Sequence, residues 1–316
     1  FRDAATDAPN DPAIQAAWGE MFLDGRCQTC NTDALKSFQT VLKLEPKWAP
    51  ALLGTALATR DDNPPAAVAT ARKALEINPA LTGAHLFIAS EAADAGHRDE
   101  ARKAIQNALT INPNSLEAHS LLAALSFIED KQQDFDREVQ AVLAISPNYG
   151  EVYRLAAEFA SHNYRYDEAA VLVRKGLALD PKNPRALSDL GTHLLRTGDE
   201  PGARAALEQS FKEHPYDVVS YNLLQMMDTL DKFVTIRDGE FIIRMDKADA
   251  AVMGDSVVSL AHEAMAAMTK RYQFTPKGPI LIEIFPKHDD FAVRNVGLPG
   301  MVGALGACFG RVVTMD

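Results

Sequence analysis

The stretch Ala101-Arg-Lys-Ala-Ile-Gln-Asn-Ala-Leu-Thr-Ile-Asn-Pro113 carries a pattern that repeats along this 316-residue chain. Its final proline recurs at intervals of 33 or 34 residues. Small residues recur with it, twelve residues before the proline and ten residues after it. Such internal repetition is typical of repeat architectures. The prolines of this series are Pro46, Pro79, Pro113, Pro147, Pro181 and Pro215.

The repeated columns predict paired helices. Small residues are expected where two helix backbones approach closely, and larger apolar residues beside them fill the core. Phe38, Ile105 and Leu207 hold such a larger position, eight residues before their prolines. Proline lacks an N–H and disfavours helix in the residue before it, so each proline is expected to end the second helix of a unit. Gly96 and Gly198 stand where the chain should turn between paired helices.

This pattern resembles the tetratricopeptide repeat family over residues 12–232, with about six repeats and a further helix. The resemblance implies a mainly α fold, an α-solenoid in which helical hairpins stack into a right-handed superhelix. Stacked repeats of this kind form a concave groove, lined by the first helix of each repeat. The resemblance therefore implies a scaffold that binds a protein or peptide partner, and not an enzyme. Residues 233–316 form a separate, incomplete α/β segment.

The expected groove face lies four, seven, eleven and fifteen residues after each proline. Arginines on this face could bind a carboxylate or an acidic peptide segment. The alternative is a solvated face on which the neighbouring glutamates balance the arginines. The candidate peptide-binding residues are Glu151, Arg154, Glu158, His162, Arg185, Thr192 and Arg196.

Composition restricts the class of partner. The chain has 32 Lys and Arg against 43 Asp and Glu, a formal net charge of -11. This acidity argues against nucleic acid or an anionic membrane surface as the partner, since both require a basic patch. No apolar stretch approaches the roughly 18 residues needed to span a bilayer, so we expect no membrane insertion. The chain begins at Phe1 without a basic and then apolar leader, so no signal peptide is expected within it.

Two cysteines, Cys27 and Cys30, lie in an insertion within the first repeat. Half of a zinc site would need a second ligand pair nearby, and a redox motif would need a strand that leads into a helix. A disulfide that closes the inserted loop, or two free thiols, fits the sequence better. A disulfide would suit an exported protein, so we expect an extracytoplasmic location, periplasmic or secreted.

A pair of histidines, His85 and His119, occupies equivalent positions in successive repeats. Stacked histidines suggest a metal site. The alternative is that this column takes a large, half-buried ring, because Tyr153 and Tyr221 fill it in later repeats. We favour the second interpretation and expect no metal ligands here.

The pattern changes to mixed strands and helices after residue 232. Two β-rich runs flank Asp238-Gly239, a dipeptide that favours a tight hairpin turn because both central residues need positive φ. A long amphipathic helix should follow, and then a buried strand. The predicted elements are a hairpin over 233–245, a helix over 248–272, a strand over 279–285, a helix over 288–296, a glycine-rich loop over 297–310 and a last strand over 310–315.

The end of the chain resembles the lead-in of a gluzincin-type, peptidase MA-like metallopeptidase domain. The resemblance rests on Ile284-Phe-Pro286, His288, Phe291 and Arg294, and on the glycine-rich run up to Arg311. It implies an alternative function, as the substrate-recruiting part of a secreted zinc metallopeptidase.

Catalysis in that family requires H-E-x-x-H, which places two imidazoles on one helix face toward zinc. The run His262-Glu263-Ala-Met-Ala266 has alanine in place of the second histidine. We therefore expect no catalytic residue, no metal site and no cofactor in this chain, and zinc only in a longer parent protein. The glycine-rich loop also lacks the phosphate-binding motifs. Cys308 is expected to be packed rather than nucleophilic.

Overall fold

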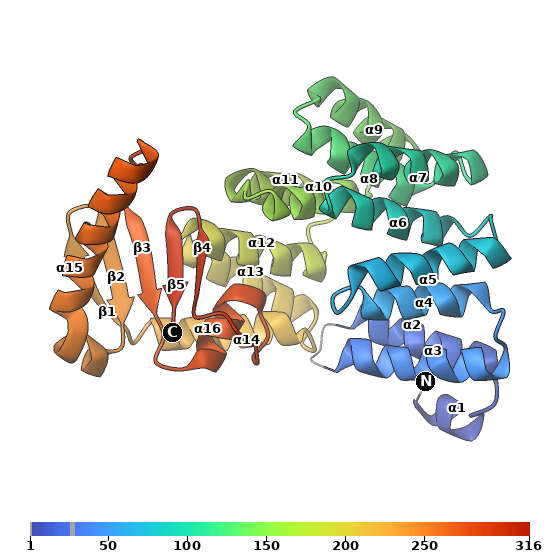
Figure 1. Cartoon of the computed structure of the whole chain (residues 1–316), viewed down its shortest axis with the longest axis horizontal. Helices are drawn as coiled ribbons and strands as arrows, with labels where there is room; N and C mark the ends of the chain where they lie inside the picture. Colours follow the sequence, from blue (N-terminus) through green and yellow to red (C-terminus); the bar gives the residue numbers. More distant parts are fainter. Residues whose placement is uncertain (1, 26–28) are drawn as a thin grey trace. The chain divides into compact units, whose positions relative to one another are not determined.

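The computed structural model describes residues 2–25 and 29–316, and its helices pair as the repeat predicts (Figure 1). A short α1 (Arg2–Asp7) comes before the hairpins. The first helices of the hairpins are α2 (Pro12–Asp24), α4 (Ala49–Thr59), α6 (Thr82–Asp94), α8 (Leu116–Ile128), α10 (Glu151–His162), α12 (Pro184–Thr197) and α14 (Val218–Leu230). The second helices are α3 (Cys30–Leu44), α5 (Pro64–Ile77), α7 (Arg98–Ile111), α9 (Gln132–Ile145), α11 (Tyr166–Leu179) and α13 (Glu200–Glu213).

The chain forms two compact units. Unit 1 comprises Phe1–Asn163 with Ala178–Asp180, and unit 2 comprises Tyr164–Leu177 with Pro181–Asp316. The predicted domain division at 232/233 lies within unit 2, between the end of α14 and the first strand. Helical hairpins of the tetratricopeptide-repeat type, followed by a small sheet, confirm the predicted fold class.

The hairpin ends have the predicted chemistry. Each second helix ends two residues before its proline, and the intervening N–H closes the helix, as when Asn112 N donates to Ala108 O at 2.9 Å. Gly96 and Gly198 take φ angles of 77° and 84° at the turns between paired helices. This left-handed conformation carries no penalty at glycine, because glycine has no Cβ.

Close helix packing explains the small-residue columns. Ala67, Ala101 and Ala203 are fully buried at the position twelve residues before the proline. In the first hairpins the ring of Phe38, 1% exposed, fills the core between two glycines. A Cβ added at Gly54 would lie 2.3 Å from Phe38 Cζ, and one added at Gly19 would lie 2.8 Å from it. The benzyl side chain therefore occupies the space that these residues leave empty.

Gly54→Ala should lower the free energy of unfolding by about 1–3 kcal/mol, because the added methyl group overpacks the core against Phe38. Phe38→Leu removes the ring atoms that collide. The double variant should therefore lose less stability than the sum of the two single variants, as measured by urea denaturation. Strict additivity of the two changes would show that Gly54 does not make room for the ring.

Unit 2 ends in a sheet with the strand order β1-β2-β3-β5-β4. The β1–β2 and β4–β5 pairs are antiparallel, and β2–β3 and β3–β5 are parallel. The strands and the two helices of this region are β1 (Val234–Asp238), β2 (Phe241–Met245), α15 (Lys247–Tyr272), β3 (Ile280–Ile284), α16 (His288–Val296), β4 (Gly306–Phe309) and β5 (Val312–Met315).

Two local predictions were wrong. The predicted glycine-rich loop contains β4, which pairs with β5 across a turn in which Gly310 has a φ of 69°. The first hairpin is displaced by one residue, because Asp238 pairs with Phe241 and therefore belongs to the ladder. Its turn is centred on Gly239 and Glu240, and of these only Gly239 has a positive φ.

The sheet has two chemically different faces. One face is apolar and packs against α15, with Phe241, Ile243 and Met245 at its centre (Figure 1). The opposite face carries two cross-strand rows, because alternate residues of a strand point to opposite sides. One row is Thr235, Arg244, Glu283 and Thr314, and the other is Arg237, Ile242, Leu281 and Val312.

A buried polar network fixes α16 to this second face. The side chains of Glu283 and Arg294 are both 0% exposed, and Arg294 Nε donates to Glu283 Oε2 at 2.8 Å. Arg294 also donates to the Leu195 carbonyl of α12, at 2.8 Å. Beside it, Thr314 donates to Asn295 Oδ1 at 2.8 Å. The ion pair therefore ties the sheet to the helical hairpins within unit 2.

Arg294→Met should lower the free energy of unfolding by about 3–5 kcal/mol, because it removes the hydrogen-bonded partner of the buried Glu283 carboxylate and leaves only Arg244 Nη1, 3.8 Å away, beside it. The double variant Arg294→Met with Glu283→Leu should recover part of this loss. Arg237→Met is the control: Arg237 is exposed and no described residue forms an ion pair with it, so its replacement should change stability by less than about 0.5 kcal/mol. Urea denaturation checks all three, and an unchanged midpoint for Arg294→Met would contradict a structural role for the pair.

Candidate functional site

The predicted binding residues of unit 1 lie on α10, and Arg154 is paired with two glutamates of that helix. Arg154 is 7% exposed. Its Nε lies 2.7 Å from both carboxylate oxygens of Glu151, and its Nη1 lies 3.3 Å from Glu158 Oε2. His162 is exposed, and its Nδ1 lies 3.5 Å from Asp94 of α6. A ligand carboxylate would therefore compete with two glutamates for Arg154.

The predicted binding residues of unit 2 lie on α12 and have different surroundings. Arg185 is exposed near the start of the helix, and Thr192 donates to the Ser188 carbonyl at 3.1 Å. The Arg196 guanidinium lies 5.6 Å from the ring centroid of Tyr166 and 5.3 Å from that of Phe309. Burial lowers the pKa of Arg196. Rings from α11 and β4 thus cover the arginine that was predicted to face a peptide.

The first-helix face of α8 is packed rather than open. Ser120 and Ala124 stand seven and eleven residues after Pro113 and are 1% and 0% exposed. Helix α8 packs against α10. In this part of unit 1, these two positions predicted to line a groove are therefore buried.

Tyr149 stands just before α10, close to the charged residues of that helix. Burial, together with the charges of Glu117 and Glu151 and against the smaller opposing effect of Arg154, raises the pKa of Tyr149 to about 12. Since the ordinary pKa is 10.0, the folded chain holds this proton more tightly than the unfolded chain does. The contribution of Tyr149 to stability is therefore complete below pH 10 and is lost as the pH rises through about 12.

Tyrosinate absorbance measured against pH should show Tyr149 ionising with a pKa of about 12, against the ordinary tyrosine pKa of 10.0. Tyr149→Phe should remove this late component and reduce the loss of stability between pH 10 and 12. A titration in which the wild type and this variant differ only at the early step would contradict the assignment.

An open groove in unit 1 lies between the second helices α5 and α7. Its main part has a volume of about 780 Å³ and a floor made by Leu75, Ile88 and Ala104. A second hollow of about 290 Å³ adjoins it, and both are lined by Arg72, Ile88 and Glu100. We call the two hollows together the α5–α7 groove. Its remaining lining residues are Pro64, Pro65, Val68, Glu76, His85, Glu91, Ala92, Ala95, His97, Asp99, Lys103 and Asn107.

The rim of the α5–α7 groove is charged. Arg72 Nη2 lies 2.6 Å from Glu100 Oε1, which joins α5 to α7. Glu91 lies 2.9 Å from Arg60, and burial raises the pKa of this glutamate. Four carboxylates (Glu76, Glu91, Asp99 and Glu100) line the groove, against the two cations Arg72 and Lys103. The groove thus combines an apolar floor with a rim that is acidic in balance.

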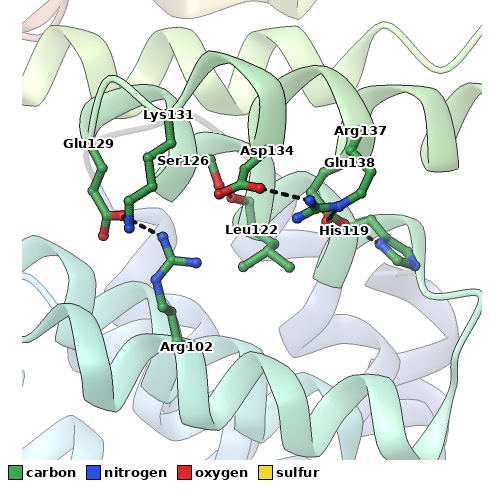
Figure 2. Close-up of polar contacts among 9 residues, drawn as sticks. All are labelled: Arg102, His119, Leu122, Ser126, Glu129, Lys131, Asp134, Arg137 and Glu138. Carbon is green, nitrogen blue, oxygen red and sulfur yellow. Dashed lines mark hydrogen bonds and ion pairs between the residues drawn. The ribbon is translucent and has the colours of Figure 1, made fainter.

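A cluster of ion pairs occupies the next interval, between α7 and α9 (Figure 2). Arg102 Nη2 lies 2.5 Å from Glu129 Oε2, and Lys131 Nζ lies 2.7 Å from the same oxygen. Burial by itself would raise the pKa of Glu129, but hydrogen bonds from Lys131 and Arg102 hold this pKa below its ordinary value. At the other side of the cluster, Glu138 accepts from His119 and from Arg137, at 2.8 and 3.1 Å. These contacts fasten α7, α8 and α9 together.

The two histidines of the repeated column contact the backbone of their own repeats. His85 Nε2 lies 3.0 Å from the Pro79 carbonyl, and His119 Nε2 lies 3.0 Å from the Pro113 carbonyl. Each ring therefore contacts the backbone carbonyl of the proline that precedes its own helix. Among residues 2–25 and 29–316, no cluster of His, Cys, Asp or Glu side chains is arranged to hold a metal ion.

Cys308 was expected to be packed, but the structure shows it exposed. Cys30 is disulfide-bonded, and Cys27 lies outside the described residues. His262, the first residue of the incomplete zinc motif, has its Nε2 2.7 Å from Asp238 Oδ1 and packs edge-on against Phe241. In the part of the chain that the structure describes, none of the helices has the length and apolar character to cross a bilayer.

Part of this chain is similar to known proteins. Residues 160–225 match the family described as Tetratricopeptide repeat. A thermophilic TPR protein of Thermus thermophilus, TTC0263, is 18% identical with a TM-score of 0.47, and the match covers 58% of this chain and all of that one. No curated protein sequence matches significantly.

Two larger structures are also similar to part of this chain. The APC/C hetero-tetramer Cut9-Hcn1 is 16% identical with a TM-score of 0.47, and the match covers 71% of this chain but only 44% of that one. Yeast Tom70 is 16% identical with a TM-score of 0.49, over 72% of this chain and 50% of that one. The match thus covers half or less of the length of either of these two chains. The match over residues 160–225 supports the tetratricopeptide-repeat assignment predicted from the proline period.

Proposed function

We propose that this chain is a protein- or peptide-binding scaffold and that the α5–α7 groove holds a segment of the partner. The observation that supports this proposal is the groove of about 780 Å³ with Leu75, Ile88 and Ala104 at its base. Pockets that bind ligands commonly join an apolar base to a few polar groups that fix orientation. The adjoining hollow extends the groove along the helices and suits a chain-like ligand.

The charges on the rim suggest the chemistry of the bound segment. Glu76, Asp99 and Glu100 stand beside the apolar floor, and Arg72 is already paired with Glu100. A segment with an apolar side chain next to lysine or arginine would bury the first group on Ile88 and bring the second to the carboxylates. Electrostatic complementarity of this kind sets specificity and the association rate more than it sets affinity.

The α10 face of unit 1 and the α12 face of unit 2, each taken by itself, remain alternative candidate surfaces for the same function. Glu151, Glu158, His162, Arg185 and Thr192 are at least partly exposed there. The structure favours the α5–α7 groove, because Arg154 is paired with glutamates and Arg196 is covered by rings. Binding of an acidic segment on α10 would require the Glu151 and Glu158 carboxylates to be displaced from Arg154.

Location and cofactor content stay predictions. The disulfide at Cys30 favours an oxidising compartment, and we propose a periplasmic or secreted protein. We also propose that the chain needs no cofactor. The metallopeptidase alternative rests only on the resemblance of residues 284–311, and the contacts of His262 add nothing to it.

Selection of twelve-residue peptides from a random display library on the whole chain tests the scaffold. Selected peptides should combine an apolar residue with neighbouring basic residues. Asn107→Trp places an indole in the α5–α7 groove and should weaken the best peptide by at least about tenfold, as measured by fluorescence anisotropy. Gln106→Trp is the matched control, because Gln106 is exposed on the same helix but does not line the groove.

Two outcomes would overturn the groove assignment. One is a peptide that binds the Asn107→Trp variant as tightly as the wild type but is lost on Glu158→Lys, which would place the site on α10. The other is a library that yields no peptide with reproducible affinity for the folded chain, which would contradict the scaffold proposal itself.

A further inference from the structure

A second hollow lies in unit 2, on the face of the sheet that turns away from α15. Its volume is about 340 Å³. The turn between α12 and α13 forms one wall, and strands β1, β2, β3 and β5 form the floor. We call it the sheet cleft. Its lining residues are Thr197, Gly198, Glu200, Thr235, Arg237, Ile242, Arg244, Pro279, Leu281, Arg311 and Val312.

The register of the strands gives this cleft an apolar floor between two cations. Ile242, Leu281 and Val312 lie side by side on successive strands. Arg237 continues the row on β1, and Arg311 stands directly before Val312 at the other end. Adjacent strands are about 4.8 Å apart, so three intervals separate the two arginine backbones by roughly 14 Å.

The three arginines of the cleft differ in how they are paired. Arg244 forms an ion pair with Glu200 and donates to the Leu230 carbonyl at 2.7 Å. Arg237 and Arg311 are exposed, and no described residue forms a hydrogen bond or ion pair with either guanidinium. Since Glu200 is neutralised by Arg244, two uncompensated positive charges face the cleft of a chain whose net charge is -11.

We propose that the sheet cleft binds an organic carboxylate with an apolar body. Guanidinium groups match the geometry of a carboxylate and bind it through charge-assisted hydrogen bonds. The apolar part of the ligand would cover Ile242, Leu281 and Val312, and the Thr235 hydroxyl offers a further donor or acceptor. A fatty or aromatic carboxylate and the carboxyl terminus of a peptide share this chemistry.

This site is separate from the proposed peptide groove. The α5–α7 groove is built by unit 1 and the sheet cleft by unit 2. The test of the sheet cleft therefore succeeds or fails independently of the peptide selection described above.

Isothermal titration calorimetry with octanoate and with N-acetyl-Ala-Leu-Leu tests the proposal on the whole chain. At least one of the two carboxylates should bind, and its uncharged amide, octanamide or the peptide amide, should bind at least about tenfold more weakly. The double variant Arg237→Gln with Arg311→Gln should show a loss of the same size. Arg174→Gln is the matched control, because Arg174 is exposed on α11 of the same unit and does not line the cleft.

The comparison of the two ligands identifies the source. Binding of octanoate alone points to a small-molecule carboxylate, and binding of the peptide alone points to a chain terminus. Three results would overturn the proposal: no binding of either carboxylate, equal binding of acid and amide, or full affinity in the double arginine variant. Circular dichroism and the thermal midpoint of each variant show that a loss of binding is not a loss of fold.

Discussion

Close approach of helix backbones is the constraint on which the hairpins of this protein depend. Two helices can lie side by side only where the residues between them are small, and the chain supplies such residues at a fixed interval. Phe38 shows the principle most clearly, since its ring fills the space left by Gly19 and Gly54. Once these contacts fix the spacing of the helices, longer side chains at the rim can form ion pairs between neighbouring repeats.

One of these ion pairs recurs along the chain. Arg102 of α7 binds Glu129 in unit 1, and Arg204 of α13 binds Asp231 in unit 2. In each case the partners are 27 residues apart and hold the same positions relative to their prolines. The carboxylate is at or just beyond the end of a first helix, and the arginine is on the second helix before it. The repeat thus specifies the polar contacts between hairpins as well as the apolar ones.

The sequence predicted the hairpins well, because their signal is local and is renewed in every repeat. The candidate site was less predictable. The pairing of Arg154 was visible in principle, since Glu151 and Glu158 stand three and four residues away on one helix face. The covering of Arg196 was not, because Phe309 lies far along the chain on a strand of four residues. The α5–α7 groove was not predicted, because the family resemblance implies a groove lined by the first helices, and α5 and α7 are second helices.

Arg244 of β2 and Arg294 of α16 determine whether the sheet can be separated from the helical hairpins of unit 2. Arg294 reaches a carbonyl of α12, and Arg244 reaches Glu200 and the last carbonyl of α14. A protease that cut the short connection between α14 and β1 would not release an independent sheet domain. Each fragment would expose charges that are buried in the intact unit, so the last hairpins and the sheet should melt in a single cooperative step.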